Sequence, residues 1–438
     1  MDSSKHNNSR PLPPYTRYTM DMFFTSAGEG DAEITKFNEW RVEVHDANAY
    51  SFEVPHLGAQ RTEVQVRPVS GPDINLISFA SYNYLGYSYH PEVVEAAKAA
   101  LDQYGLGATG SPVLNGTFQI HMDLEQQLVD FFGLPGRGCT TFSSGYGANI
   151  GVISAYIHKG DYVVLDRRSH ASLFDGAILS RGNIKLFRHN DMDHLKSVLE
   201  SITGHKRRIL VCTEGVFSAD GDEGNLVDLV PLAKSYGAAV LVDEAHTLLV
   251  SGPGGRGIAA EQGVLEDVDM LIGTFSKSFG GVGGFLLASQ QLSFYVRFYA
   301  RSRMFSCAID PAVTGGIIKA LELGSGPDGH AKRKRIMENA DYLRNKLEGK
   351  VDTGPSHTWI IPVIYGHERI TIPLSNYLQD HGLDTSLMTF PAVPKNVSRI
   401  RLFVTSEHTR EQLDRGAEIV LDAARHFEFS TEFQEQPA

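Results

Sequence analysis

The chain has 438 residues, of which 42% are hydrophobic and 21% are charged, as is typical of a globular protein with a large core. Its formal net charge of −12 at pH 7 argues against nucleic acid or an anionic membrane as the main partner. The sequence has no apolar run that could cross a bilayer and no signal-peptide core at its start, so we expect a cytoplasmic protein without a transmembrane segment.

Residues 1–75 are predicted to form an N-terminal tail and arm. About the first 30 residues are polar and contain several prolines and glycines, as a tail does. Within them, 15–18 and 20–24 are apolar enough to dock on the body of the protein or on a partner. Further on, a helix is predicted over 91–104, with a proline in its first turn and a glycine directly after it.

From about residue 138 to 290 the sequence repeats a pattern of strand, loop and helix. Apolar strands are expected at 162–165, 209–212, 239–242 and 270–273, with helices between them, for example over 229–236. Short apolar strands separated by helices predict a mostly parallel α/β sheet with helices on both faces, which we place in a large domain at 76–320. Ligands gather at the carboxyl ends of such strands, so one site is expected around the polar strand ends Asp166, Glu214, Asp243 and Thr274.

After about residue 320 the character of the sequence changes. The glycine-rich segment 324–329 predicts a linker, and 330–347 predicts a charged helix. Its KRKR run at 332–335 is typical of a solvated face. Alternating strands and helices up to about residue 425 predict a smaller α+β domain, which we place at 321–438.

The three cysteines, Cys139, Cys212 and Cys307, are far apart in the sequence. They form no CxxC pair and no cluster with histidines, so we expect buried, reduced thiols and no metal site.

Lys277 is the most informative residue. It lies in the string GTFSKSFGG at 273–281, directly after an apolar run. The hydroxyls and free amides of such a loop can hold a phosphate while the amine attacks a carbonyl, which favours a Schiff base with an aldehyde cofactor. A solvated lysine in a Gly/Ser loop is the alternative.

Other residues complete a possible cofactor site. Asp243 at a strand end could cap a helix or form an ion pair. It could also pair with the protonated ring nitrogen of pyridoxal phosphate (PLP), which keeps the ring an electron sink, with His246 reaching the ring's O3′. His170, which could equally bond to backbone at a helix start, could stack on that ring and handle protons. A predicted helix start offers the free amides of Gly145 and Tyr146 to a phosphate.

The chain resembles the α-oxoamine synthases, a family of fold-type I PLP enzymes. The resemblance spans about residues 75–425 and rests on strings that follow the family's order. They are SYNYLG at 81–86, GATGS at 107–111, NGTFQIHMDLE at 115–125, SGY at 144–146, HAS at 170–172, TEGVFS at 213–218, VDEAH at 242–246, GTFSK at 273–277 and TSEHT at 405–409. The strings at 115 and 273 look closest to bacterial serine palmitoyltransferases.

The resemblance implies a fold-type I PLP-dependent transferase. Its large domain would contain a mostly parallel seven-stranded sheet covered by helices, followed by the smaller C-terminal domain. The family forms homodimers with shared active sites, so a homodimer is also implied.

The resemblance also implies roles for individual residues. Lys277 would carry PLP as a Schiff base and remove the Cα proton, Asp243 would pair with the pyridinium, and His170 would stack on the ring. His246 and Ser218 would lie near O3′. The phosphate would be bound by Gly145, Tyr146, Thr274, Ser276 and, from the second subunit, Ser306. Asn83 would lie near the amino acid, and His121 would border the acyl entrance.

Two positions depart from the bacterial palmitoyltransferase pattern. Thr389 stands where those enzymes have an arginine that can contact the substrate carboxylate, and Pro112 stands where they have another arginine. The FPAVP string at 390–394 resembles instead the members that place this arginine further on, at a position matching Arg401. A guanidinium suits a carboxylate, although Arg401 could also pair with a structural acid.

The activity implied is that of an acyltransferase. It would condense serine, glycine or alanine with an acyl thioester of coenzyme A or of an acyl carrier protein, with loss of CO2, to give an α-amino ketone. The same chemistry could release a polyketide or carrier-bound chain in secondary metabolism. A PLP aminotransferase and a non-catalytic subunit are the alternatives, although such subunits lack the lysine that this chain has at 277.

Overall fold

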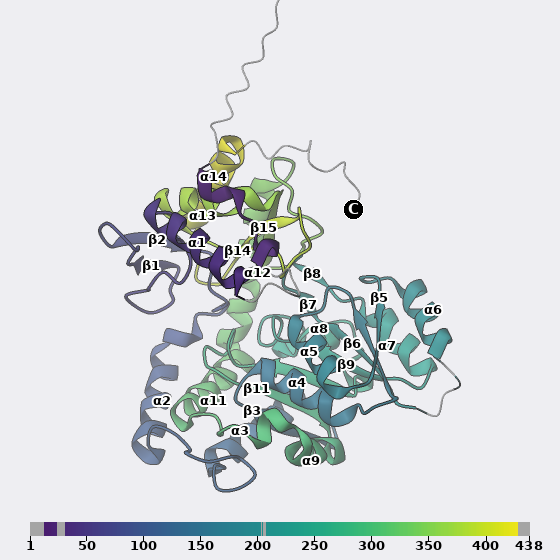
Figure 1. The fold of residues 1–438 in the computed structure, drawn as a ribbon. Helices are drawn as coiled ribbons and strands as arrows, with labels where there is room; N and C mark the ends of the chain where they lie inside the picture. The colour runs from purple at the N-terminus through teal and green to yellow at the C-terminus, as the bar shows by residue number, and fades with distance from the viewer. Residues whose placement is uncertain (1–12, 24–30, 203, 205–206, 428–438) are drawn as a thin grey trace, which may run out of the picture.

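The computed structural model describes residues 13–23, 31–202, 204 and 207–427. The larger lobe, the lower one in Figure 1, is built around a seven-stranded sheet, in which β11 is antiparallel to both neighbours and the other strands run parallel to one another. The order across the sheet is β3 (Arg137–Phe142), β11 (Gly284–Ser289), β10 (Met270–Thr274), β9 (Ala239–Asp243), β6 (Ile209–Glu214), β4 (Tyr162–Asp166) and β5 (Asn183–Phe187). The predicted mostly parallel seven-stranded sheet is confirmed, and each of the four predicted strands is present.

Helices cover both faces of this sheet because its strands are apolar on both sides. In β4, Val163 and Leu165 pack in one cluster with α4 and α5, whereas Val164 packs in the other cluster. The predicted helix 91–104 is confirmed as α2. The helices of this lobe are α2 (Pro91–Tyr104), α3 (Gln119–Phe132), α4 (Gly145–Tyr156), α5 (Ala171–Ser180), α6 (Met192–Ile202), α7 (Leu226–Ser235), α8 (Ile258–Glu261), α9 (Gln290–Tyr299), α10 (Arg301–Met304) and α11 (Pro311–Ser325).

A second, smaller lobe has mixed α and β structure, as predicted for the C-terminal part (Figure 1). Its two sheets are β12–β15–β14 and β1–β2–β13. The strands are β1 (Glu63–Val66), β2 (Ile74–Ser78), β12 (Ile360–Gly366), β13 (Leu383–Asp384), β14 (Ser386–Met388) and β15 (Ser398–Phe403). The helices are α1 (Ala32–Asp46), α12 (Pro327–Leu347), α13 (Thr371–Asp380) and α14 (Arg410–His426).

The N-terminal arm belongs to this second lobe. Strand β2 pairs in parallel with β13, so it spans the expected boundary at residue 75 and joins the C-terminal part of the chain. In the described part of the arm, Tyr15 is buried in a cluster with Trp40 and with Ile372 of α13. The docking of 15–18 on the body is therefore confirmed, whereas Phe24 lies outside the described residues.

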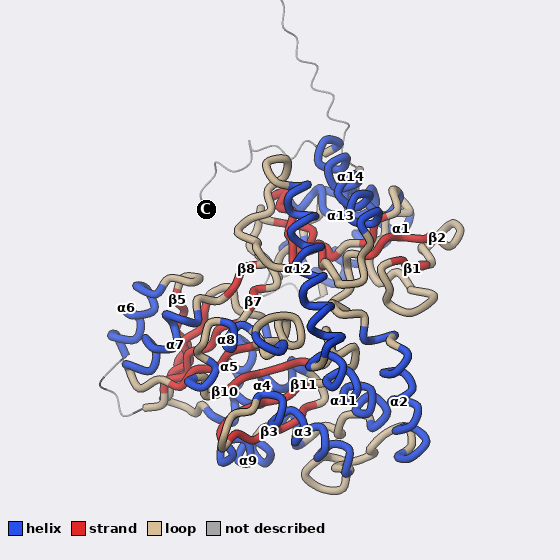
Figure 2. The backbone as a smooth tube through the Cα atoms, turned by 180° about the vertical axis from the view of Figure 1, so that it is seen from behind, coloured by secondary structure: helices blue, strands red, loops and turns tan. Residues whose placement is uncertain are grey.

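The linker expected at 324–329 is wrong. Helix α11 ends at Ser325 and α12 begins at Pro327, so only Gly326 separates them. Proline is compatible with the first turn of a helix, so it does not stop the new one. Figure 2 shows α12 leading from the lobe of the large sheet into the second lobe.

The solvated face expected at 332–335 is also partly wrong. Lys332 is buried, and its amine donates to the carbonyl of Leu85 at 2.9 Å and to the carboxylate of Glu407 at 2.7 Å. The first residue of the basic run therefore ties α12 to two distant loops, while Lys334 and Arg335 are exposed.

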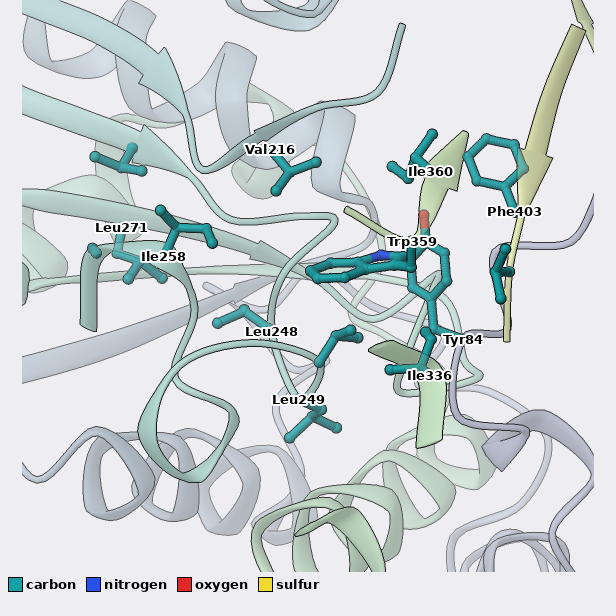
Figure 3. Packing of buried hydrophobic residues seen from close by; sticks show 14 of the residues in the cluster. Tyr84, Val216, Leu248, Leu249, Ile258, Leu271, Ile336, Trp359, Ile360 and Phe403 are labelled. Atoms are coloured by element: carbon teal, nitrogen blue, oxygen red, sulfur yellow. The ribbon is translucent and has the colours of Figure 1, made fainter. Parts of the chain in front are cut away.

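One hydrophobic core extends across both lobes. Figure 3 shows Leu271 of the large sheet and Ile360 and Phe403 of the second lobe on either side of Trp359. The ring of Trp359 packs edge-on against Tyr84, with ring centroids 6.0 Å apart. This shared core fixes the second lobe against the carboxyl ends of the large sheet.

Within the described residues, no helix is long and apolar enough to span a membrane, and no group of His, Cys, Asp and Glu side chains could hold a metal ion. Cys139 and Cys212 are buried as predicted. Cys307 is exposed, contrary to the prediction, because it lies in an irregular segment after α10.

Candidate functional site

A cavity opens at the carboxyl ends of β6, β9 and β10, between the sheet and the start of α4. Seven of the predicted cofactor residues line it: Gly145, Tyr146, His170, Asp243, His246, Thr274 and Lys277. Glu214 lines it as well, whereas Asp166, the fourth polar strand end, does not and instead bonds to His189. Three of the four expected strand ends thus meet at one site.

Lys277 follows β10 and directs its amine into this cavity. The amine lies 5.9 Å from the centre of the Tyr82 ring. Desolvation lowers the pKa of the amine to about 8, and the charge of Arg401 acts in the same direction, while Asp243 and Glu214 oppose the shift. Lys277 is thus half-buried rather than a fully solvated surface lysine, and the lowered pKa leaves more of its amine in the nucleophilic, deprotonated form near neutral pH.

Asp243 ends β9, and its side chain is buried. One oxygen accepts a hydrogen bond from the Ala245 amide at 2.9 Å, and the other accepts one from the side chain of Asn149 at 2.6 Å. Asn149 in turn donates to the hydroxyl of Ser172 at 2.9 Å. These bonds fix the carboxylate against the cavity wall, where it can face a cationic ring nitrogen.

The start of α4 provides an anion site. Ser144 caps the helix by accepting a bond from the Gly147 amide at 2.9 Å, and this leaves the amides of Gly145 and Tyr146 without an acceptor in the described part of the chain. Beside them, the Thr274 hydroxyl accepts a bond from the Ser276 amide at 3.3 Å. Unpaired amides and hydroxyls at a helix N-terminus form a favourable site for a phosphate.

Replacing Gly145 with alanine should weaken cofactor binding about tenfold. A β-carbon on Gly145 would lie 2.8 Å from the Thr274 hydroxyl, so that one of the two groups must move. Cofactor affinity can be measured by titrating apoprotein and following absorbance. Gly58→Ala is the matched control, because a β-carbon there would meet nothing within 4 Å. Equal affinity in both variants would contradict this account of the anion site.

His170 directly precedes α5, where its side chain both caps the helix and lines the cavity. Its Nδ1 accepts a bond from the Ser172 amide at 3.2 Å, so the bond to backbone considered as an alternative does exist. Its ring still lines the cavity, and partial desolvation lowers its pKa. The backbone amide of His170 donates to the carboxylate of Glu214, whose own pKa burial raises well above the usual value.

His246 lies in a turn after Asp243 rather than on a helix. Its Nδ1 is 2.7 Å from the hydroxyl of Tyr84, and burial lowers its pKa well below the usual value, as do the nearby charges of Lys277 and Arg401. A neutral ring held in this way can still offer its other nitrogen to a polar group in the cavity.

Arg401 lies on β15, and its side chain is buried. Its guanidinium donates to the carbonyl of Ser218 at 3.2 Å and to the hydroxyl of Ser386 at 2.8 Å, and it lies 3.4 Å from the hydroxyl of Tyr82. No carboxylate of the described residues pairs with it, and its Nε has no acceptor there. By contrast, Arg399 on the same strand pairs with Asp220 at 2.7 Å.

Arg401 and the remaining predicted residues do not line the lysine cavity. The carbonyl of Ser218 accepts a hydrogen bond from Arg401. Ser276 is exposed, and Ser306 lies in the segment that follows α10. Asn83 is engaged in its own loop, donating to Ser88 at 2.8 Å. Both ring nitrogens of His121 are bonded to backbone, to Phe118 at 3.0 Å and Ile309 at 2.8 Å, in a separate small cavity that Pro112 also lines.

Asn149 and Tyr82 are site residues that the sequence did not single out. Asn149 lies one helical turn after Gly145, a spacing that places both on one face of α4. Tyr82 belongs to the SYNYLG string at 81–86, in which only Asn83 was given a role. Neither residue carries a local signal that separates it from an ordinary structural side chain.

Comparisons with known proteins identify the family to which this chain is similar. The family model described as aminotransferase class I and II matches residues 74–420. A serine palmitoyltransferase of Sphingobacterium spiritivorum is 35% identical over 394 residues, which are 90% of this chain and 96% of that protein. An 8-amino-7-oxononanoate synthase of Alkaliphilus metalliredigens is 39% identical over 345 residues, which are 78% of this chain and 86% of that protein.

A solved structure points to the same family. Serine palmitoyltransferase from S. paucimobilis, with a bound PLP–myriocin aldimine, has a TM-score of 0.85 and 32% identity, covering 92% of this chain and 100% of that one. The cavity fits PLP, because an anion site, a buried carboxylate and a desolvated lysine all line it. The chain therefore belongs to the aminotransferase class I and II family and, within it, to the PLP-dependent α-oxoamine synthases.

Proposed function

We propose that this α-oxoamine synthase condenses a small amino acid (serine, glycine or alanine) with a fatty acyl thioester to give an α-amino ketone and CO2. The observation that carries the proposal is the buried guanidinium of Arg401, which has no carboxylate partner among the described residues. A buried cation without a counter-ion is costly, so a substrate carboxylate would relieve that cost on binding.

In this proposal, Arg401 and Lys277 would contact the same substrate from two sides. Tyr82 connects them, since its hydroxyl is 3.4 Å from the guanidinium and its ring is 5.9 Å from the amine of Lys277. An amino acid whose carboxylate is gripped by Arg401 would thus present its Cα to Lys277. The grip would also decide which bond at Cα is broken.

The remaining roles follow from the cavity. When bound, PLP supplies an electron sink for the charge that develops at Cα. Asp243 would keep the ring nitrogen of PLP protonated, and Gly145, Tyr146, Thr274 and Ser276 would hold its phosphate. Lys277, as a free amine, would take the Cα proton. His170 would cover the ring, and partial desolvation, which lowers its pKa, favours the neutral imidazole.

We also propose that the active protein is a homodimer in which Ser306 of a second copy reaches the phosphate. Leu114 and Phe305 are 83% and 71% exposed, which is unusual for large apolar side chains. Their segments are neighbours, because the hydroxyl of Ser111 donates to the carbonyl of Met304 at 2.7 Å. A second copy covering this patch would lie directly beside Ser306.

The substrates can be found in two steps. Serine, glycine and alanine are first screened for a change in cofactor absorbance, and thioesters of increasing length, on coenzyme A or on a carrier protein, are then added. We expect CO2 and an amino ketone only when both substrates are present. A carrier-bound donor used in preference would support release of a polyketide or carrier-bound chain instead. Loss of the cofactor band with amino acid alone, together with a keto acid product, would indicate an aminotransferase and contradict the proposal.

A further inference from the structure

His189 lies outside the cavity and connects two segments that contribute to the site. Its Nδ1 is 3.0 Å from one oxygen of Asp166, and its Nε2 is 2.7 Å from Asp222. Asp166 ends β4, four residues before His170, and Asp222 begins β8 (Asp222–Glu223). A neutral imidazole has only one N–H, so donation to both carboxylates requires the imidazolium.

The buried carboxylate of Asp222 depends on His189 for its hydrogen bond. It is 7% exposed, His189 is its hydrogen-bond donor, and its second oxygen has no partner among the described residues. Asp166 has further donors, the amides of Arg168 at 2.9 Å and Asn190 at 3.1 Å. Loss of the proton on His189 would therefore remove the positive charge beside the buried carboxylate of Asp222 and leave one N–H for two carboxylates, which is unfavourable.

The hairpin that carries Asp222 also forms the support of Arg401. Strand β7 (Val216–Phe217) pairs with β8, and Phe217 lies directly opposite Asp222. The next residue, Ser218, accepts the hydrogen bond from Arg401 through its carbonyl. The ring of Phe217 packs edge-on against the His189 ring, with centroids 4.5 Å apart. A shift of Asp222 would thus be transmitted directly to Ser218.

We propose that His189 is a positioning residue which, as an imidazolium, joins the β7–β8 hairpin to the end of β4 and thereby holds the carbonyl of Ser218 against Arg401. The consequence for substrate binding rests on the carboxylate grip of Arg401 proposed above, whereas the joining of hairpin and strand does not.

The charges around His189 define how this bridge responds to pH. Burial alone would lower the pKa of His189, but the hydrogen bonds to Asp166 and Asp222 and their charges outweigh it and raise that pKa to about 9. The other acidic groups of the hairpin are already paired, Asp220 with Arg399 and Arg168, and Glu223 with His357. The side chain of Asn190 also approaches Nε2, at 3.5 Å, and carries no charge.

The bridge should stabilise the protein in a defined pH window. In the folded protein the pKa of His189 is about 9, above the ordinary value of 6.5. The contribution of protonated His189 to stability is therefore complete below about pH 6.5 and is lost as the pH rises through 9. In His189→Gln, loaded with PLP, we expect a melting temperature roughly 2 °C or more below wild type at pH 6.5, and no difference at pH 10. A deficit that is the same at both pH values would overturn the proposal.

Substrate binding provides the second measurement. The dissociation constant of L-serine, followed by cofactor absorbance at pH 7, should rise about tenfold in His189→Gln. His357→Gln is the matched control: it removes a histidine–carboxylate contact of 3.5 Å from the same hairpin, but its side chain is 56% exposed, so no change is expected. If Arg401→Ala weakens L-serine binding but His189→Gln does not, His189 is not a positioning residue. If Arg401→Ala has no effect either, the proposed grip itself fails.

A variant of the partner carboxylate tests the proposal even if His189→Gln does not fold. Asp222→Asn leaves His189 with one carboxylate, so the pKa of His189 should fall and the pH-dependent stability should be lost at lower pH than in wild type. A melting curve of Asp222→Asn with the pH dependence of wild type would overturn the proposal on its own.

Discussion

Replacing Lys277 with alanine should lower the rate of condensation by at least about 10³-fold. The variant loses the amine that carries the cofactor and also the base that takes the Cα proton. At a pKa of about 8, roughly one amine in ten is deprotonated at pH 7, compared with roughly one in 3,000 for an ordinary lysine. Turnover is measured as CO2 release from amino acid and thioester.

A covalent test separates this role from a structural one. Borohydride treatment of wild type should fix the cofactor to the peptide that contains Lys277, as detected by mass spectrometry, and no peptide of Lys277→Ala should be labelled. Lys98→Ala removes an exposed lysine, whose contact with Glu95 is 3.4 Å, and should retain both the label and the activity. Wild-type turnover in Lys277→Ala would refute the catalytic assignment.

Replacing Arg401 with alanine should raise the Michaelis constant for the amino acid on the order of 100-fold. Two charge-assisted hydrogen bonds to a carboxylate, at about 1.5 kcal/mol each, correspond to this factor. Arg401→Lys keeps the charge but loses the planar fork, so it should lie between alanine and wild type. Steady-state kinetics at saturating thioester give the value for each variant.

The matched control for Arg401 is a ligand. Ethanolamine is serine without its carboxylate, so it should bind equally well to wild type and to Arg401→Ala. The preference of wild type for serine over ethanolamine should therefore disappear in the variant. A loss of affinity for both ligands would show that Arg401 only supports the fold of β15, and the carboxylate grip would then be wrong.

The sheet and the cofactor residues could be predicted because their signals are local. Strand β9 is a continuous apolar run that ends in Asp243, and β10 is another that ends just before Lys277. Because parallel strands end at the same edge, the sequence alone indicates that such polar ends meet. The signal for the start of α4 at Gly145 is equally local, since a capped helix start can be recognised from a few consecutive residues.

Contacts between distant segments explain the errors. Asp166 was expected at the site, but it binds His189, which comes 23 positions later and carries no signal of its own. The basic run at 332–335 looks solvated when read residue by residue. However, Lys332 lies one helical turn before the fully buried Ile336, so the helical period placed it on the inner face of α12.

The acyl side of the site could not be predicted in the same way. His121 was chosen for its place in a matched string, yet both its ring nitrogens are bonded to backbone, so it shapes the wall near Pro112 rather than offering a polar group. Asn149 shows the converse, because an amide in an apolar helix gives no indication that it orients a carboxylate until α4 and β9 are brought together.

The small sheet β1–β2–β13 can be completed only late in synthesis, because its strands come from distant parts of the chain. Ser78 at the end of β2 donates to Asp384 of β13 at 2.6 Å, and the two residues are 306 positions apart. At about 5–20 residues per second, a ribosome needs on the order of 15 to 60 s to deliver the partner strand. During that time the edge of β2 has no β13 to pair with, and an unpaired strand edge is open to non-native pairing until residue 384 has been made.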